Sequence, residues 1–457
     1  MTFALTAPKQ QPKDLLFSKK DILHLMIPLI IEQALTCFVG LADSIMVAQA
    51  GEAAVSGVSL VDSINTLIIM MLSALAAGGA VVAGHYLGQR DVKDARRVAN
   101  QLMSFMTVLS LGITALLYLL RRPMFAVLFG DIEPDVYDSA TIYYLIVALS
   151  TPFFAVFTTG SAIFRTMGNT APSMQVSLIM NIVNIVGNAV LIFGFHMGAA
   201  GVAIPTTVSR LVAAAIIARM LFRPTVELSL TRDLLRRWDG PMVRRILTLG
   251  IPNGIESSLF QMGKIIMLCV VSMFGTAAIA ANAVGNTMAN FESLPGNAIN
   301  LGLVAVVAQC VGAGDYEQAR YYVRQLIKLV YACHIVFNVA ILLCMPLIVT
   351  AYNLSPEGAA MARQTILLHS VFCMIHWAPS WSLPAALRAA GDAKYSMVVG
   401  VLSMWIVRLA GGWLLAVPCG MGMIGVWYAM LIDWVVRAAL YYHRYRGTKW
   451  YAHNLIA

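Results

Sequence analysis

Long apolar stretches alternate with short polar connections along almost the whole chain of 457 residues. A helix needs roughly 20 apolar residues to cross a hydrocarbon core of about 30 Å, so each long stretch is a candidate membrane span. Twelve spans are predicted, at residues 22–47, 56–84, 98–120, 137–164, 172–195, 198–222, 243–271, 277–308, 321–350, 360–387, 395–417 and 421–442. The strands of a β-barrel would be shorter and would alternate apolar with polar residues, which these stretches do not. The pattern predicts an all-α, polytopic membrane protein.

The composition fits this class, because 59% of the residues are hydrophobic and only 12% are charged, whereas soluble domains average about 25% charged residues. The net charge of +9 raises the question of a nucleic-acid partner. The basic residues, however, gather on every second connection, as at Lys19 and Lys20, Arg96 and Arg97, and Arg236 and Arg237. The opposite stretches AQAGEAAVSG and LFGDIEPDVYDSA contain none. By the positive-inside rule both termini are predicted to be cytoplasmic, and we expect no nucleic-acid partner.

The sequence lacks the common motifs for catalysis and metal binding. Its seven cysteines are scattered through apolar stretches without a CxxC pair, which is typical of small core residues rather than of a disulfide or metal framework. No HExxH, GxSxG or DDxxD motif occurs, so we expect neither an enzyme nor a covalent cofactor.

The second half of the chain repeats the first at a shift of 224 residues. This shift superposes IPLIIEQAL on IPNGIESSL, and LGQRDVKDARRVANQL on VGAGDYEQARYYVRQL, without a gap. Each copy holds six predicted helices, and an even number of helices brings each copy back to the side where it began, so the halves are predicted to be parallel repeats. A central cleft between two such bundles is the expected substrate site.

The repeat divides the chain into five predicted segments. They are a cytoplasmic lead-in (residues 1–21), an N-lobe of helices 1 to 6 (22–222), a cytoplasmic linker (223–242), a C-lobe of helices 7 to 12 (243–442) and a cytoplasmic tail (443–457). The linker has an amphipathic pattern, which favours a helix lying on the membrane surface.

One aspartate, Asp43, lies in the apolar run FVGLADSIMV without a nearby Lys or Arg. A charge at the bilayer centre costs at least about 2.5 to 3.5 kcal/mol, so this residue needs a partner or a function. On the fifth span, Asn184 and Asn188 are spaced to share one helix face, and Thr206 lies on the sixth. Since hard cations such as Na⁺ favour oxygen ligands, these four residues form a candidate Na⁺ site, and a proton could occupy the same carboxylate. The alternative is that the asparagines only join helices by hydrogen bonds.

A second group of polar residues is predicted to line the cleft. On the eighth span, Asn286 and Asn290 belong to a row of polar residues at steps of three or four, and Asp62 is the repeat partner of Asn286. The full set is Glu32, Asp62, Lys264, Asn286, Asn290, Glu256 and Glu292. A dry interface between helices is the alternative for this row. Glu32 and Glu256 could also bind backbone groups freed by Pro28 and Pro252, and Lys264 could neutralise a carboxylate. We expect Arg210, Arg408 and Asp433 in structural pairs, and His334, His369 and His376 as packed residues.

Several motifs in order resemble the multidrug and toxic compound extrusion (MATE) family: PLIIEQALTCFVGLADSIMVAQAGEAAVSGVS, the connections LGQRD and VGAGD, FRTMGNT and NIVGNAVLIFG. The resemblance implies two six-helix lobes around a V-shaped cleft, and a secondary antiporter that expels cationic, often aromatic, drugs in exchange for inward Na⁺ or H⁺. It also implies that Asp43 is the coupling-ion residue and that Asn184 and Thr206 line the same site. Many relatives have a second aspartate at the position of Asn188. One branch has a glutamate where Phe260 stands, so a second-lobe sodium site is not expected.

The predicted function is therefore export of small organic cations by alternating access of the two lobes, with H⁺ or Na⁺ as coupling ion and Asp43 as its carrier. We expect a monomer in the lipid bilayer of the plasma membrane, the inner membrane of a bacterium. The alternative is a flippase for a lipid-linked saccharide of the same superfamily. Such a protein needs a cationic cleft for pyrophosphate, and Lys264, Arg210 and Arg408 keep this alternative open.

Overall fold

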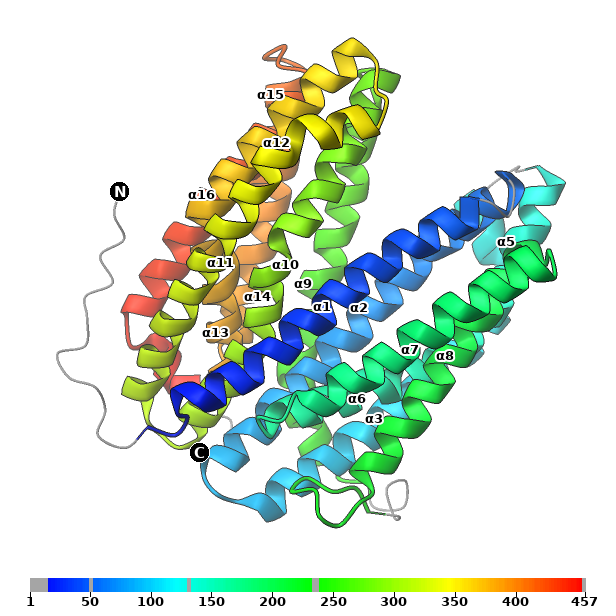
Figure 1. The fold of residues 1–457 in the computed structure, drawn as a ribbon. Coiled ribbons are helices and arrows are strands. Elements are labelled where there is room, and N and C mark those ends of the chain that lie inside the picture. Colours follow the sequence, from blue (N-terminus) through cyan, green and yellow to red (C-terminus); the bar gives the residue numbers. More distant parts are fainter. Residues whose placement is uncertain (1–14, 49–51, 130–132, 232–237, 454–457) are drawn as a thin grey trace. The chain divides into compact units, whose positions relative to one another are not determined.

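The computed structural model describes residues 15–48, 52–129, 133–231 and 238–453, and every regular element in these ranges is a helix (Figure 1). The first half contains α1 (Lys19–Ala48), α2 (Glu52–Gly88), α3 (Val92–Leu119), α4 (Arg121–Phe129), α5 (Pro134–Leu149), α6 (Thr151–Thr166), α7 (Ala171–Ala189), η1 (Val190–Gly194) and α8 (Gly198–Leu221). The second half contains α9 (Gly240–Ser272), α10 (Thr276–Gly312), α11 (Tyr316–Ala351), α12 (Pro356–Trp377), η2 (Ala378–Ser382), α13 (Leu383–Ala389), α14 (Ala393–Leu402), η3 (Ser403–Ala410), α15 (Gly411–Ala416), α16 (Met423–Arg446) and η4 (Lys449–His453).

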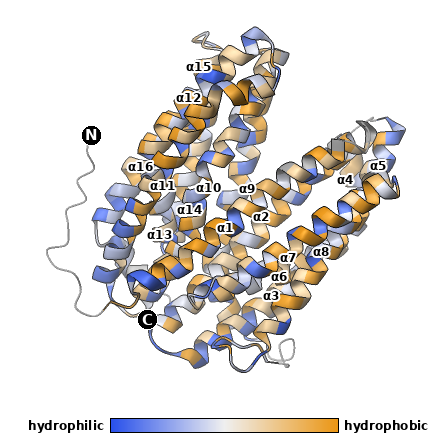
Figure 2. Cartoon of the chain, in the orientation of Figure 1, coloured by the Kyte–Doolittle hydropathy of each residue, from blue (hydrophilic) through white to orange (hydrophobic). Residues whose placement is uncertain are grey.

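Eleven helical segments of the described chain are long and apolar enough to cross a membrane. A twelfth span consists of α5 and α6, which meet at a bend of 44°. Pro152 lies at the start of α6, where its missing N–H interrupts the hydrogen-bond ladder between the two helices. Figure 2 shows apolar residues along the helix shafts and hydrophilic residues toward many helix ends. The prediction of twelve membrane helices in two six-helix repeats is confirmed.

Contacts within the chain define two compact units, an N-terminal unit (residues 23–254) and a C-terminal unit (residues 255–457 together with residues 1–22). The described start of the chain joins the C-terminal unit through two backbone amides. The Leu16 N–H donates to Gln318 Oε1 at 2.9 Å, and the Phe17 N–H donates to the Tyr322 hydroxyl at 2.8 Å. The predicted lobe boundaries and the V-shaped cleft between the lobes stay predictions.

The linker predicted as a surface helix has a different structure where it is described. Residues 223–231 form successive turns, and residues 232–237 lie outside the described ranges. The Leu230 N–H donates to the Leu221 carbonyl at 2.9 Å, and the Thr231 N–H donates to Asn100 Oδ1 at 2.8 Å. These bonds hold the turns against the N-terminal unit, and Pro224 is incompatible with the interior of a helix that continues α8.

The two connections that the repeat superposes have the same local structure. Asp91 caps α3 by accepting from the Asp94 N–H, and Asp315 caps α11 by accepting from the Gln318 N–H. The residue before each cap has a positive φ, 62° at Arg90 and 73° at Gly314, a conformation that glycine adopts freely and arginine adopts at some cost. The repeat seen in the sequence is therefore a repeat of backbone structure.

Candidate functional site

The predicted ion site is assembled inside the N-terminal unit from three helices. Asp43 comes from α1, Asn184 and Asn188 from α7, and Thr206 from α8. Asn188 Nδ2 donates to Asp43 Oδ1 at 2.8 Å. When the Asn184 amide is turned with its nitrogen toward Asp43, it donates to both carboxylate oxygens at 2.9 and 3.2 Å and accepts from Thr206 Oγ1 at 3.2 Å. All four residues that the sequence singled out for an ion thus lie in one cluster.

The local sequence explains why α7 and α8 approach closely at this point. Gly187 faces Pro205, and a Cβ on Gly187 would lie 2.7 Å from Pro205 Cβ, so only glycine allows this separation of the helices. Asn184 and Asn188 flank Gly187 on the same face of α7, and Thr206 follows Pro205 on α8. Close packing therefore positions the polar side chains around the carboxylate.

No fixed cation neutralises Asp43 in the part of the chain that the structure describes, because none of the ion pairs there involves it. The charge that acts on it electrostatically is a second carboxylate, Asp62. Asp62 accepts a hydrogen bond from the Tyr143 hydroxyl at 3.0 Å. Arg210 acts on Asp62 and Tyr143 through its charge but donates its hydrogen bond to Ser150 Oγ, at 2.7 Å. Among the described residues, the hydrogen bonds to the Asp43 carboxylate therefore come from neutral amides.

The other residues predicted to line the cleft fall into separate environments. Glu32 is buried in the N-terminal unit, where both of its oxygens accept from Ser173 Oγ at 3.0 and 3.1 Å. Glu256, in the C-terminal unit, pairs with Arg388 at 3.2 Å. Both glutamates therefore have side-chain partners, instead of the proline-freed backbone groups considered above. Asn290 is exposed on α10.

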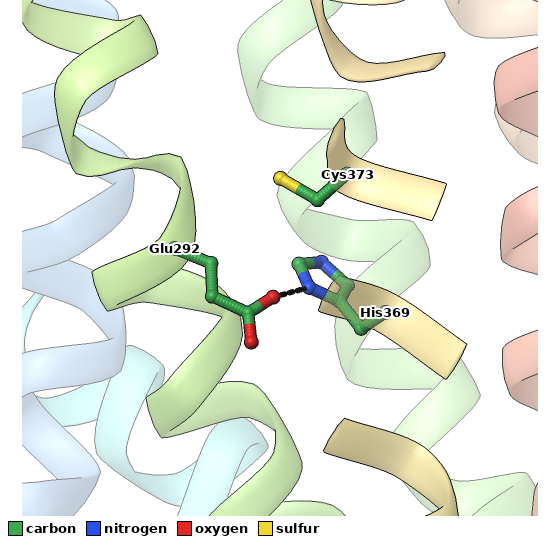
Figure 3. A group of neighbouring side chains, drawn as sticks. All are labelled: Glu292, His369 and Cys373. Atoms are coloured by element: carbon green, nitrogen blue, oxygen red, sulfur yellow. Dashed lines mark hydrogen bonds and ion pairs between the residues drawn. The ribbon is translucent and has the colours of Figure 1, made fainter. Parts of the chain in front are cut away.

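Glu292 is fully buried in the C-terminal unit, in a cluster that the sequence did not predict (Figure 3). Its carboxylate contacts His369 Nδ1 and accepts from Ser370 Oγ at 2.5 Å. Glu292, His369 and Cys373 offer ligand atoms that all lie within 4.8 Å of one another. Both oxygens of Glu292 already have side-chain partners within the protein. We therefore interpret the cluster as structural. The spacing of His369 and Cys373, one helical turn apart, was the available sequence signal.

Lys264, predicted to neutralise a carboxylate, has no such partner among the described residues; the charge that acts on it is that of Arg408. Asp433 does lie in a structural pair, as expected, but its partner is Arg437 at 3.0 Å, one turn along α16, which was not among the residues expected to pair. That spacing of four residues was visible in the sequence and favours an ion pair.

Two repeated six-helix units with polar clusters inside membrane-length helices define a polytopic helical transporter. The MatE family model matches residues 28–190 and 252–414, two segments whose starts are 224 residues apart, as in the internal repeat. The chain belongs to this family, the multidrug and toxic compound extrusion transporters. It is a transporter and not an enzyme.

Similar proteins agree with this assignment. The chain is 28% identical to "Uncharacterized transporter YisQ" of Bacillus subtilis, over 98% of both chains. It is 24% identical to "Probable multidrug resistance protein NorM" of Thermotoga maritima, over 97% of this chain and 95% of that one. A solved outward-facing structure of a multidrug resistance MATE family transporter matches with a TM-score of 0.87 and 19% identity, over 93% of this chain and 95% of that chain, which shows a shared fold. These names give the flippase alternative no support.

Proposed function

We propose that the chain is a secondary antiporter that exports small organic cations in exchange for inward H⁺ or Na⁺, with Asp43 as the coupling residue. One observation carries the proposal. The Asp43 carboxylate accepts hydrogen bonds from the amides of Asn184 and Asn188 and has no ion pair among the described residues. An unneutralised carboxylate at this depth is costly unless a mobile positive species binds it.

Binding of the ion drives alternating access only if the two conformations bind it unequally. The amides of Asn184 and Asn188 belong to α7, whereas the carboxylate belongs to α1. An ion that binds Asp43 replaces the hydrogen bonds between α1 and α7 with contacts to the ion. Occupancy of the ion site is therefore linked to the relative position of these two helices. This linkage supports an exchange in which the ion and the organic cation use the N-terminal unit in turn.

The transport experiment compares wild type with Asp43→Asn in proteoliposomes under separately imposed sodium and proton gradients, with a fluorescent organic cation as substrate. We expect ion-driven transport to fall at least about 100-fold, because Asn keeps the shape and removes the charge. Asp138→Asn is the matched control, since Asp138 is an exposed acid in the same unit. Unchanged transport by Asp43→Asn would remove the proposed coupling role.

A second variant separates the two candidate ions. Na⁺ needs several oxygen ligands, and Asn188 Oδ1 is a buried oxygen that has no hydrogen-bond partner among the described groups. Thr206 Oγ1, the hydroxyl that bonds to Asn184, is a further uncharged oxygen of this cluster. Thr206→Val removes this oxygen with little change of shape, so it should weaken Na⁺-driven transport about tenfold and leave H⁺-driven transport intact. Equal loss under both gradients would argue against a direct Na⁺ ligand here.

We further propose a plasma-membrane location, a monomeric state and cytoplasmic termini. The orientation is supported by the basic residues that gather at one set of helix ends, such as Arg444 and Arg446 in the last turn of α16. A reporter enzyme that is active only in the cytoplasm, fused after residue 457, should be active. Activity of a periplasmic reporter at that position would reverse the orientation.

A further inference from the structure

The C-terminal unit contains an open pocket of about 220 Å³ whose walls carry two cations. Its lining comes from α9, α10, η3 and α16: Gln261, Lys264, Ile265, Met267, Leu268, Val271, Asn282, Asn286, Arg408, Val426, Trp427 and Met430. Lys264 is exposed and Arg408 partly buried, so both cations reach the open space. A pocket of this volume accepts a group of one or two rings rather than a drug-sized molecule.

The charges at this pocket do not balance within the described residues. Lys264 and Arg408 act on each other as like charges. The carboxylate that acts on Arg408 is Asp433, and that residue is already bonded to Arg437 at 3.0 Å. Arg408 and Arg437 therefore share one carboxylate, and no ion pair of the described residues provides one for Lys264. A single negative group between Lys264 and Arg408 would offset the repulsion between them.

The two cations lie the same number of residues from the ends of their membrane-length helical segments. Lys264 lies eight residues before the end of α9, and Arg408, in η3, lies eight residues before the end of α15, which completes the same membrane-length segment. Two independent snorkelling side chains need not share a level or a cavity. Their convergence on one pocket favours a common ligand.

The remaining walls suit the body of an amphipathic molecule. Trp427 is fixed by its indole N–H, which donates to Asn282 Oδ1 at 3.1 Å. Met267, Leu268 and Met430 supply apolar surface beside it. Apolar surface and the two cations therefore line the same pocket.

The internal repeat relates this pocket to the ion site of the N-terminal unit. At the shift of 224 residues, Met267 matches Asp43, Arg408 matches Asn184 and Met430 matches Thr206, and all three lie in the pocket lining. Lys264 matches Gly40 at the same shift. The position that holds a carboxylate in one half therefore holds a thioether in the other, with two cations added around it.

We propose that this pocket binds an oxyanion carried on an apolar body, with the carboxylate or phosphate between Lys264 and Arg408 and the body against Trp427. The Arg408 guanidinium matches the two oxygens of such a group, and its face lies over the Phe260 ring at 5.4 Å from the centroid, which limits its orientations. This inference is independent of the coupling role of Asp43.

Binding is tested with the purified full chain in detergent, by titration calorimetry with 2-naphthoate. The neutral 2-naphthylmethanol and the cationic 2-naphthylmethylammonium have the same body and serve as ligand controls. Naphthoate should bind at least tenfold more tightly than either. Lys264→Met and Arg408→Gln should each weaken naphthoate binding about 10- to 100-fold, the range for loss of a charge-assisted hydrogen bond.

Matched variants exclude a general effect of charge. Lys328→Met removes an exposed lysine from α11 of the same unit and should leave binding unchanged, whereas Lys264→Arg keeps the charge and should retain it. Equal affinity for the neutral analogue, or full binding by Lys264→Met, overturns the proposal. If a charge-removing variant does not fold, the rise in the unfolding temperature of wild type with naphthoate, compared with naphthylmethanol, decides the same question.

A second arm separates a free organic acid from a lipid headgroup. Naphthoate binding is measured in nanodiscs of phosphatidylcholine alone and with added phosphatidic acid. Competition by phosphatidic acid, without competition by the same amount of added phosphatidylcholine, identifies a lipid phosphate as an occupant; the absence of this competition identifies the free acid. Failure of both ligands to bind overturns the oxyanion site.

Discussion

The ion site of the N-terminal unit and the pocket of the C-terminal unit occupy equivalent positions of a repeat and differ in the sign of their charge. In the first, the Asp43 carboxylate is held by the neutral amides of Asn184 and Asn188. In the second, Lys264 and Arg408 face an open pocket with Met267 at the equivalent of Asp43. The two halves share the same repeated helices but carry different side chains at equivalent positions. The role of a residue in one half therefore cannot be assigned to its repeat partner by symmetry.

The difference extends to how particular carboxylates are held in the two units. In the C-terminal unit, the described residues Asp433 and Glu256 are paired with Arg437 and Arg388. In the N-terminal unit, Asp43 has only neutral partners of this kind. Fixed pairs are suited to stability, whereas a carboxylate with neutral partners is available to a mobile ion. The same chemical change should therefore have different consequences in the two units.

The largest effect on stability is expected for Asp433→Asn. Asp433 and Arg437 are both buried, and Asp433 Oδ1 also accepts from Ser403. The variant leaves Arg437 without its carboxylate, close to Arg408, and should lower the free energy of unfolding by roughly 3 to 5 kcal/mol. Thermal and denaturant unfolding in detergent, followed by tryptophan fluorescence, measure this loss.

The control for this prediction removes both charges. Asp433→Leu combined with Arg437→Met fills a similar volume with apolar groups and should regain most of the stability. If Asp433→Asn is as stable as wild type, the ion pair of Asp433 and Arg437 does not stabilise the packing of α16. That result would contradict the proposed contrast between a structural Asp433 and an ion-binding Asp43.

The next effect concerns the charge of the pocket. Met267→Asp places a carboxylate at the equivalent of Asp43, where it neutralises the cations from within the protein. Affinity for 2-naphthoate should fall at least about tenfold, which is roughly 1.4 kcal/mol. Met267→Leu is the control, because it keeps an apolar side chain over Gly412, to which Met267 lies close. Retained affinity in Met267→Asp would show that charge does not govern the pocket.

The sequence was sufficient to predict the membrane helices and the cluster around Asp43. Twenty-residue apolar runs specify spans almost regardless of their neighbours. The spacing of Asn184 and Asn188 specifies a shared face, and family motifs indicate which helix lies opposite. The bend between α5 and α6 did not prevent the prediction of a single span, since the apolar run continues through it.

The partners in the C-terminal unit were harder to predict because they come from distant helices. Glu256 pairs with Arg388, 132 residues away, and Glu292 contacts His369, 77 residues away. An acidic residue in an apolar helix is expected to have a partner, but the sequence does not show which helix supplies that partner. In contrast, Asp433 and Arg437 lie one turn apart, and attention to spacing alone would have paired them.

A smaller effect is expected for Tyr143→Phe in the N-terminal unit. The Tyr143 hydroxyl donates to Asp62 Oδ1 at 3.0 Å, and Asp62 is exposed, so water can replace the lost donor. The free energy of unfolding should fall by about 1 kcal/mol. Asp62→Asn keeps an acceptor for the hydroxyl and should change stability by less than this. A loss of several kcal/mol in either variant would place Asp62 in a fixed structural network.

The smallest effect on stability is expected for Asp43→Asn, the same chemical change that is most harmful at Asp433. The new amide can present its oxygen to Asn188 Nδ2, the donor that lies 2.8 Å from the present carboxylate, and no paired cation of the described residues is left behind. The free energy of unfolding should therefore change by no more than about 1 kcal/mol. The same unfolding assay compares the two variants directly. A loss as large as that of Asp433→Asn would mean that Asp43 is a structural carboxylate, whereas stability kept together with lost transport would separate its role in coupling from any role in folding.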